Sequence, residues 1–187
     1  MIVNMQPGDL FKIRTATLED VFLLGKIEQA AAEIFDSDVL PSDIKKHTLP
    51  LSMLDEGVKN GSLWVACVSS GPVEEIVGYA LARIMETSGH LAQIDVSPPF
   101  MRKGIGGALL KRTIAWAKET GLKELWLTTF EHIPWNAPFY AKFGFEIRVA
   151  KSQPAWVKHI LMQERQIALK GRVAMCIDPA VVISCEN

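Results

Sequence analysis

Three glycines fall within four positions of the stretch VSPPFMRKGIGGALLKR, residues 96–112. Two basic residues, Arg102 and Lys103, precede them, and a helical pattern follows. Backbone N–H groups that enter a helix point outward unpaired, and the helix dipole adds positive potential there. Glycines let a phosphate come close to this backbone. The stretch therefore predicts a site for the phosphates of a dinucleotide, a nucleoside triphosphate or coenzyme A.

Spacing separates these three ligands. A dinucleotide fingerprint needs a third glycine where this chain has Leu109, and no acidic residue ends a following strand about 20 residues on. A Walker A loop needs a Gly-Lys-Ser/Thr ending, which the stretch lacks. Both nucleotide interpretations fail. The remaining structural alternative is a tight turn before a helix whose basic residues are simply solvated.

The elements that position this stretch follow from hydrophobic periodicity. Thr17 and Asp20 are spaced like a capping box and predict the start of the first helix. We expect helices at residues 18–34, 51–59, 105–120, 136–143 and 155–169. We expect strands at residues 11–14, 62–68, 76–85, 90–96, 124–130, 145–150 and 172–177.

Hairpins come first in this order and helical crossovers later, which indicates a mixed sheet with helices on its faces. The predicted fold class is α/β (α+β), with a mostly antiparallel central sheet of about six to seven strands. A length of 187 residues fits one domain, residues 1–187.

Composition narrows the function classes. Twenty basic and twenty-one acidic residues give a net charge of −1, so no global field attracts nucleic acid or an anionic membrane. The cysteines, Cys67, Cys176 and Cys185, form no CxxC pair, so neither a zinc site nor a disulfide framework is suggested. The sequence has no leader pattern and no apolar run of about 18 residues. We expect a soluble cytoplasmic protein without a metal.

At the glycine stretch the sequence resembles the GNAT superfamily of N-acetyltransferases, in which a strand ending in Val is followed by x-Pro and [QR]xxGxG[AG]. Here Val96 ends the strand and Pro98 follows, but Met101 occupies the Gln/Arg position, with the arginine displaced to Arg102. A second landmark is a helix carrying Tyr and followed by Gly-Phe, which NAPFYAKFGFE at residues 136–146 matches with Tyr140. The resemblance covers about residues 11–149; a helix and strand at about 155–177 and a tail at 178–187 complete the chain.

The resemblance implies acetyl-CoA as cosubstrate and a splay between the fourth and fifth strands, residues 90–96 and 124–130. The pantetheine arm would pair with the end of the fourth strand as an extra strand does. Backbone amides of the glycine loop would hold the pyrophosphate. The expected cofactor contacts are Ile94, Asp95, Val96, Met101, Arg102, Lys103, Gly104, Ile105, Gly106, Gly107, Ala108 and Asn136.

The implied reaction is direct attack of a primary amine on the thioester in a ternary complex. Tyr140 is the candidate acid that protonates the leaving thiolate, and His90, on the fourth strand, is the candidate base. The structural alternatives are a packed helix tyrosine and an exposed turn histidine. Asp95, Glu131 and His132 are the remaining candidates for the base, each with a solvated or structural role as the alternative, and Asp95 is expected on the opposite sheet face from His90. Candidate substrate contacts, for which a solvated or core role is the alternative, are Gln93, Glu131, His132 and Trp135.

The acceptor is not named by the sequence. We expect a small-molecule amine, bound by residues 33–50, 131–135 and 151–163. A protein N-terminus or lysine side chain is the alternative within the same class, and a non-catalytic acyl-CoA-binding module is the alternative from another class. We expect a monomer or homodimer that binds neither nucleic acid nor a membrane.

Overall fold

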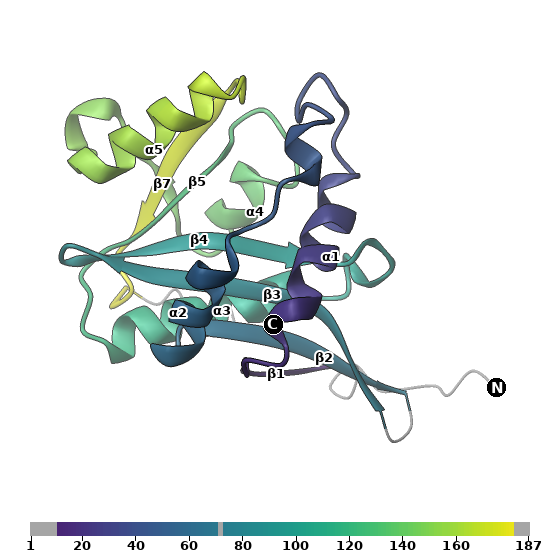
Figure 1. The fold of residues 1–187 in the computed structure, drawn as a ribbon. Coiled ribbons are helices and arrows are strands. Elements are labelled where there is room, and N and C mark those ends of the chain that lie inside the picture. Colours follow the sequence, from purple (N-terminus) through teal and green to yellow (C-terminus); the bar gives the residue numbers. More distant parts are fainter. Residues whose placement is uncertain (1–10, 71–72, 182–187) are drawn as a thin grey trace. The chain divides into compact units, whose positions relative to one another are not determined.

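The computed structural model describes residues 11–70 and 73–181. The expectations for residues 1–10 and for tail residues 182–187, including Cys185, lie outside this part of the chain. Figure 1 labels the longer elements. In chain order the described elements are β1 (Lys12–Thr15), α1 (Val21–Ala32), η1 (Ile44–Lys46), α2 (Leu51–Lys59), β2 (Leu63–Ser70), β3 (Val73–Met85), β4 (Ser88–Val96), η2 (Pro98–Phe100), α3 (Ile105–Glu119), β5 (Leu125–Phe130), α4 (Ala137–Ala141), β6 (Glu146–Ile147), η3 (Ala150–Ser152), α5 (Ala155–Gln166) and β7 (Arg172–Ile177).

The strands form a seven-stranded sheet in the order β1-β2-β3-β4-β5-β7-β6. Its mixed, mostly antiparallel character confirms the predicted fold class. The chain also divides into two compact units. Unit 1 comprises Met1–Ile34, Lys45–Ala82 and Gln93–Thr113, and unit 2 comprises Phe35–Ile44, Arg83–Ala92 and Ile114–Asn187.

Unit 1 contains the antiparallel ribbon β1-β2-β3, in which Ile13 pairs with Ala66 and Val65 with Tyr79. The β2–β3 register shifts between Ala66 and Cys67. Alternate residues of β2 face opposite ways, and both sides are buried, so the strand is apolar along most of its length.

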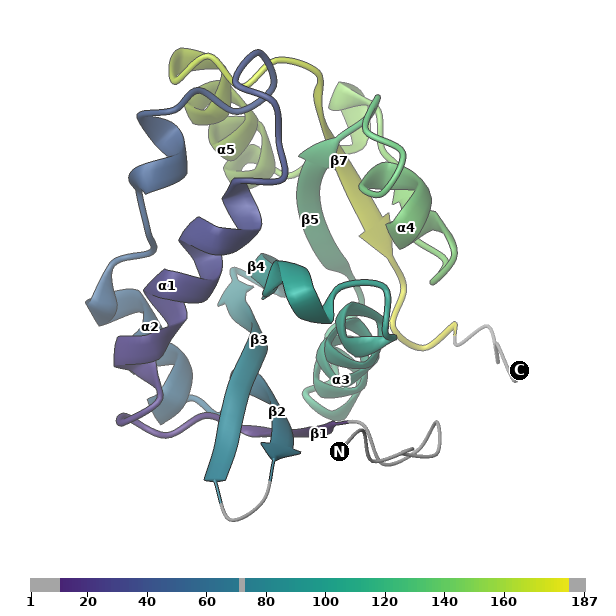
Figure 2. The ribbon, with the colours of Figure 1, turned by 90° about the vertical axis from the view of Figure 1, so that its right-hand side faces the viewer.

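Helices cover both faces of β2 and β3 in unit 1. Glu28 of α1 accepts a hydrogen bond from Tyr79, which lies on the same face as its partner Val65. The Arg112 guanidinium of α3 lies 5.2 Å from the ring centroid of Trp64, on the opposite face. Accordingly, Figure 2 shows α1 and α2 on one side of β2 and β3 and the beginning of α3 on the other.

The start of α1 differs from the capping prediction. The helix begins at Val21, and the Asp20 carboxylate accepts bonds from the Thr17 backbone N–H at 2.7 Å and its hydroxyl at 3.1 Å. Arg14 donates to both oxygens of the same carboxylate, at 2.6 and 2.9 Å. Asp20 therefore binds Thr17 as predicted, but it is anchored to β1 and holds residues 18–20 in a turn instead of a first helical turn.

Unit 2 contains β5, β6, β7 and the beginning of β4, whereas the end of β4 belongs to unit 1. β5 pairs with β7 in antiparallel register from Leu125↔Ile177 to Phe130↔Arg172, and β6 pairs with the other edge of β7. β4 and β5 pair in parallel through Gly89↔Leu125 and His90↔Trp126, at the beginnings of both strands. The splay further along these strands stays a prediction.

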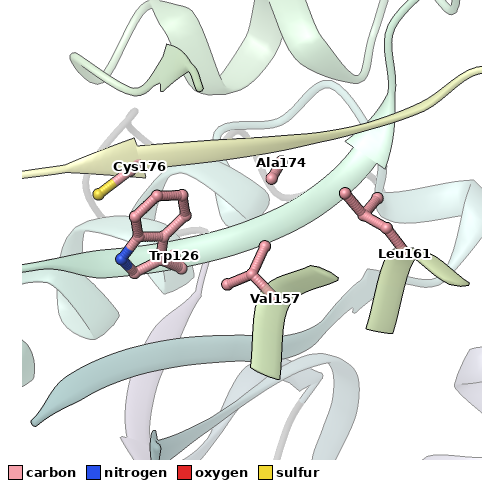
Figure 3. Packing of buried hydrophobic residues seen from close by; sticks show 5 residues of the cluster. All are labelled: Trp126, Val157, Leu161, Ala174 and Cys176. Atoms are coloured by element: carbon pink, nitrogen blue, oxygen red, sulfur yellow. The ribbon is translucent and has the colours of Figure 1, made fainter. Parts of the chain in front are cut away.

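Helix α5 covers one face of β5 and β7. Val157 and Leu161, one helical turn apart, pack against Trp126 of β5 and against Ala174 and Cys176 of β7 (Figure 3). The Trp126 indole N–H donates to Glu124 at 2.9 Å, so its polar atom is satisfied beside the cluster. This packing fixes β5, the strand that leads into residues 131–135 of the predicted acceptor site.

The bounds of β6 and α5 also differ from the prediction. β6 has two residues in place of the expected six, because only Glu146 and Ile147 pair in register with β7. α5 ends at Gln166 and not near residue 169, and Ala168 is left-handed with φ of +65°. Short 3-10 turns at residues 98–100 and 150–152 were not expected. None of the helices in the described part is both long and apolar enough to cross a membrane.

Candidate active site

The glycine loop in unit 1 is a tight turn between β4 and α3. The Met101 N–H donates to the Pro98 carbonyl at 3.2 Å, so this amide is used within the turn. Arg102 and Gly104 then take left-handed backbone conformations, with φ of +59° and +85°. These two residues reverse the chain direction, and α3 begins at Ile105.

The start of α3 presents unused backbone donors. The Ala108 N–H donates to the Gly104 carbonyl at 3.0 Å. By helix geometry the N–H groups of Ile105, Gly106 and Gly107 come before this first bond and have no acceptor within the helix. A side chain added at Gly104 would meet open space. The dipole of the 15-residue helix adds positive potential at this end.

Two cations border these amides. Arg102 and Lys103 are exposed, and the Lys103 ammonium lies 5.2 Å from the Phe100 ring centroid. Unused N–H groups, an open glycine and mobile positive charge fit a pyrophosphate. The predicted loop residues are thus brought together, except that Met101 has no free amide to offer.

At the end of β4 the two sheet faces differ. Gly78 of β3 lies against Val96, because a side chain added there would come within 3.2 Å of Val96 Cγ2. Asp95 points the other way, toward α1, as expected from strand alternation. Any contact of Asp95 with the cofactor would therefore come from its backbone, as predicted for Ile94 and Val96.

The Asp95 carboxyl belongs to a polar cluster that sequence reasoning did not assemble. Gln93 donates to Asp95 at 2.7 Å, and the Tyr79 hydroxyl donates to Glu28 at 3.2 Å while lying within hydrogen-bonding range of Asp95. The backbone N–H of Leu49 donates to the same Glu28 oxygen at 2.9 Å. We call Glu28, Tyr79, Gln93 and Asp95 the carboxyl cluster.

Burial dominates the protonation of this cluster. Desolvation raises the pKa of Asp95 to about 7; the Gln93 hydrogen bond opposes this rise and the nearby Glu28 adds to it. Desolvation also raises the pKa of Glu28, against the bonds from Leu49 and Tyr79. The pKa of Tyr79 is raised as well, first by burial and then by both carboxylates. The cluster can therefore take up or release a proton near neutral pH.

Tyr140 lies in unit 2 on α4. Its N–H donates to the Asn136 carbonyl at 3.2 Å, and its ring centroid lies 5.1 Å from that of Phe139 and 6.0 Å from that of Phe145. Aromatic neighbours thus fix the ring of a partly buried tyrosine. Asn136 caps α4 through its backbone and not its side chain, and its role as a cofactor contact stays a prediction.

His90 lies in the unit 2 part of β4, beside β5. It pairs with Trp126, and its ring centroid is 5.3 Å from that of Trp156. Burial, followed by the charge of Arg83, lowers the pKa of His90 to about 4. The imidazole is neutral at pH 7 but is a weak base there. Trp156 packs against the α5 core cluster rather than standing free.

The predicted substrate residues of unit 2 follow the end of β5. Glu131 and His132 are exposed, and Trp135 is 49% exposed. Trp135 lies 6.4 Å from Phe35, which lies 5.7 Å from Phe130, by ring centroids. Part of the predicted acceptor segment thereby joins the end of β5, through Phe35, Val39, Leu40 and Ile44 packed on Phe130, Ile133 and Leu169.

The sequence model of the acetyltransferase (GNAT) family matches residues 28–145. The chain belongs to the acetyltransferase (GNAT) family. The match contains both GNAT landmarks, the loop before α3 and the Tyr140 helix, and it confirms the resemblance. Glu28, at its first position, is the α1 member of the carboxyl cluster.

Solved GNAT-like structures share this fold. The PaiA N-acetyltransferase from Thermoplasma acidophilum, in complex with coenzyme A, is 18% identical with a TM-score of 0.62, covering 90% of this chain and 98% of that one. A Mycobacterium tuberculosis protein in complex with CoA and NLQ is 21% identical with a TM-score of 0.60, covering 89% and 98%. The ribosomal-protein-S18-alanine N-acetyltransferase from Escherichia coli is 15% identical with a TM-score of 0.62, covering 95% and 99%.

Within the described residues of this GNAT protein, no three His, Cys, Asp or Glu side chains gather closely enough to hold a metal ion. The expectation of a metal-free site nevertheless stays a prediction. So do the individual roles of the loop, Tyr140 and His90.

Proposed function

We propose that the protein transfers an acetyl group from acetyl-CoA to a primary amine of a small molecule, by direct attack in a ternary complex. The observation that carries this proposal is the start of α3, where free backbone amides, an open glycine and two exposed cations fit a pyrophosphate. Family membership and the coenzyme A in two of the similar structures support the choice of cosubstrate.

In this proposal the chain's own residues bind, orient and move protons. The N–H groups of Ile105, Gly106 and Gly107 bind the pyrophosphate, and the end of β4 offers backbone groups to the pantetheine arm. When bound, acetyl-CoA supplies a thioester that an amine can attack. Tyr140 donates its phenolic proton to the departing sulfur, because a thiolate with a conjugate pKa of about 8.5 can share a proton with a phenol of about 10.

A small amine is proposed as acceptor because the segments that follow β5 carry aromatic side chains around a partly exposed tryptophan. Similar folds serve other acceptors as well, since one structure is named for an alanine of a ribosomal protein. A peptide acceptor is therefore the second candidate.

The test is release of free CoA from acetyl-CoA across a panel of polyamines, aminoglycosides, amino acids and peptides. We expect at least one small amine to stimulate release and to yield the acetylated amide by mass spectrometry. Stimulation by peptides alone would replace the small-molecule acceptor with a protein. Tight binding of acetyl-CoA without stimulation by any amine would favour a non-catalytic acyl-CoA-binding module.

A further inference from the structure

The carboxyl cluster joins three elements of unit 1 through side chains that the mechanism above leaves unused. Glu28 comes from α1, Tyr79 from β3, and Gln93 and Asp95 from β4. Tyr79 is 0% exposed and Asp95 is partly buried. Ionising both carboxyl groups near one phenol hydroxyl is unfavourable when the groups are partly buried, because each negative charge loses solvation and repels the other.

We propose that Asp95, with Tyr79 and Glu28 behind it, is the proton acceptor for the incoming amine. This inference rests on the proposed acetyl transfer and deepens it by naming the base. Asp95 directly precedes Val96 on the strand whose end is proposed to pair with the pantetheine arm, so in that proposal Asp95 belongs to the segment that would lie beside the thioester.

The hydrogen bonds explain how one proton is stored. The Tyr79 hydroxyl carries a single proton and lies within bonding range of two carboxyl groups. When Asp95 is ionised, the hydroxyl can turn to it; when Asp95 is protonated, its own O–H can donate to Tyr79, which donates to Glu28. Leu49 and Gln93 supply fixed N–H donors at the two ends. Glu28 therefore keeps the Leu49 donor, and Asp95 keeps the Gln93 donor, in both protonation states.

Atoms and charge balance in this proton transfer. A primary amine with a pKa near 10.4 arrives largely as an ammonium ion. One N–H bond breaks, an O–H bond forms on Asp95, directly or through one water, and the electron pair stays on nitrogen for the attack. As the amide forms, the nitrogen loses its second proton to the solvent, and Tyr140 regains from the solvent the proton that it gave to the departing thiolate. Asp95 then returns its own proton to the solvent, so that one proton is released for each ammonium ion acetylated.

Asp95 is better suited to this task than His90. A general base works best when its pKa lies near the working pH. Burial raises the pKa of Asp95 to about 7, whereas burial lowers that of His90 to about 4. The groups that face Asp95 are the carboxylate of Glu28, the phenol of Tyr79 and the amide of Gln93.

The test is the pH profile of kcat/KM for the best amine of the panel. In the wild type, kcat/KM should fall about tenfold for each pH unit below about pH 7. At pH 7, kcat/KM of Asp95→Asn should be roughly 100-fold or more below the wild-type value. Glu28→Gln removes a negative charge beside Asp95 and should move the acid limb down by roughly one pH unit. Tyr79→Phe removes a donor to the ionised Asp95 and should move it up.

If Asp95 is the proton acceptor, the two variants should shift the acid limb of the kcat/KM profile in opposite directions. A merely structural cluster would change the rates without such opposite shifts. Glu19→Gln, an exposed charge change just before α1, is the matched control and should leave the limb in place. Circular dichroism and acetyl-CoA binding verify that each variant folds, and Asp95→Glu, which restores a carboxyl group, provides a second test by partial rescue.

The possible outcomes distinguish failure of the base assignment from failure of the proposed function. Turnover with an acid limb that neither Glu28→Gln nor Tyr79→Phe moves, or a wild-type profile in Asp95→Asn, overturns Asp95 as the base and leaves the acetyltransferase intact. A wild type that binds acetyl-CoA but acetylates no amine overturns the proposed function, and the base assignment falls with it.

Discussion

Gly104 and Gly121 share a backbone conformation but have different surroundings. Both have positive φ, +85° and +74°, and a side chain added at either would meet open space. Gly104 precedes α3 at the proposed phosphate site, whereas Gly121 follows the other end of the helix, where its N–H donates to Lys118 at 3.0 Å.

This pair permits a controlled substitution. Gly104→Ala and Gly121→Ala should each lower the free energy of unfolding by roughly 1–2 kcal/mol, because a left-handed L-residue costs about that much. Only Gly104→Ala should also weaken the binding of acetyl-CoA, because its methyl group would stand where the pyrophosphate is proposed to approach. Urea denaturation and calorimetric titration measure the two effects, and equal affinities in both variants would remove Gly104 from the site.

Tyr140 is the second residue whose role can be isolated. Tyr140→Phe keeps the ring contacts with Phe139 and Phe145 and deletes only the hydroxyl. We expect kcat to fall by about 100-fold, the lower range for a lost general acid, while acetyl-CoA affinity stays at the wild-type value. Steady-state kinetics with equilibrium binding measure both, and an unchanged kcat would exclude the acid role.

Among the elements, α5 and β7 are joined by a largely buried ion pair. Arg172 Nη2 lies 2.7 Å from Glu164 Oε1, both side chains are 14% exposed, and the guanidinium lies 4.6 Å from the Phe130 ring centroid. Thr128 donates to the same Glu164 oxygen at 2.7 Å. The pair therefore connects α5 and β7 to β5.

Glu164→Gln should cost about 3 kcal/mol in the free energy of unfolding, because it leaves the Arg172 charge buried without a counterion. Adding Arg172→Met should recover much of that loss. The control is Glu146→Gln, since its partner Arg148 is 3.2 Å away but both side chains are exposed, and such pairs contribute about 0.5 kcal/mol. Urea denaturation gives all three values, and equal costs for the two glutamines would contradict a role for burial.

Helices and strands were predictable where an apolar repeat runs through the whole element and turn residues flank it. The bounds of α2 and β7 agree with the sequence because apolar spacing and flanking turns mark them. The predicted start of α1 at residue 18 was wrong, because Arg14 of β1 also binds the Asp20 carboxylate. The shortness of β6 was equally hidden, because the pairing partner lies far along the chain.

At the scale of the whole molecule, the titration of buried groups makes stability depend on pH. The Asp95 carboxyl binds its proton with a pKa of about 7 when folded and about 3.9 when unfolded. Between these values the folded protein holds more protons, so this group lowers the free energy of unfolding as pH rises from about 4 to about 7. His90, with its lowered pKa of about 4, acts in the opposite sense up to about pH 6.5.

Comparing Asp95→Asn with the wild type cancels the contribution of His90. The variant should gain stability relative to the wild type steadily from pH 4 to pH 7, by at most about 1.4 kcal/mol per unit of pKa difference, and the gain should then level off. Denaturation at a series of pH values measures it. Glu19→Gln should show no such trend, and parallel profiles for Asp95→Asn and the wild type would contradict the raised pKa.

The glycine loop before α3 could be recognised in the sequence because its residues are contiguous, and its role in binding acetyl-CoA stays a prediction. The carboxyl cluster was not, since Glu28 and Tyr79 are 51 positions apart and only folding brings them together. Its one local signal was Glu28 itself, a carboxylate on the apolar stripe of a helix next to Ile27 and Leu24. A charged residue on a buried helix face needs a hydrogen-bonding or charged partner, and the hydrophobic pattern does not identify that partner.

Arg102 holds a left-handed backbone, φ of +59°, that glycine would adopt without cost. A stability screen would therefore favour Arg102→Gly, and it would equally favour replacing a buried carboxyl group. Both substitutions would remove a charge that the proposed reaction uses. Selection for greater thermal stability would therefore be expected to reduce the proposed activity at these positions first, so variants that gain stability and lose turnover should map the proposed site.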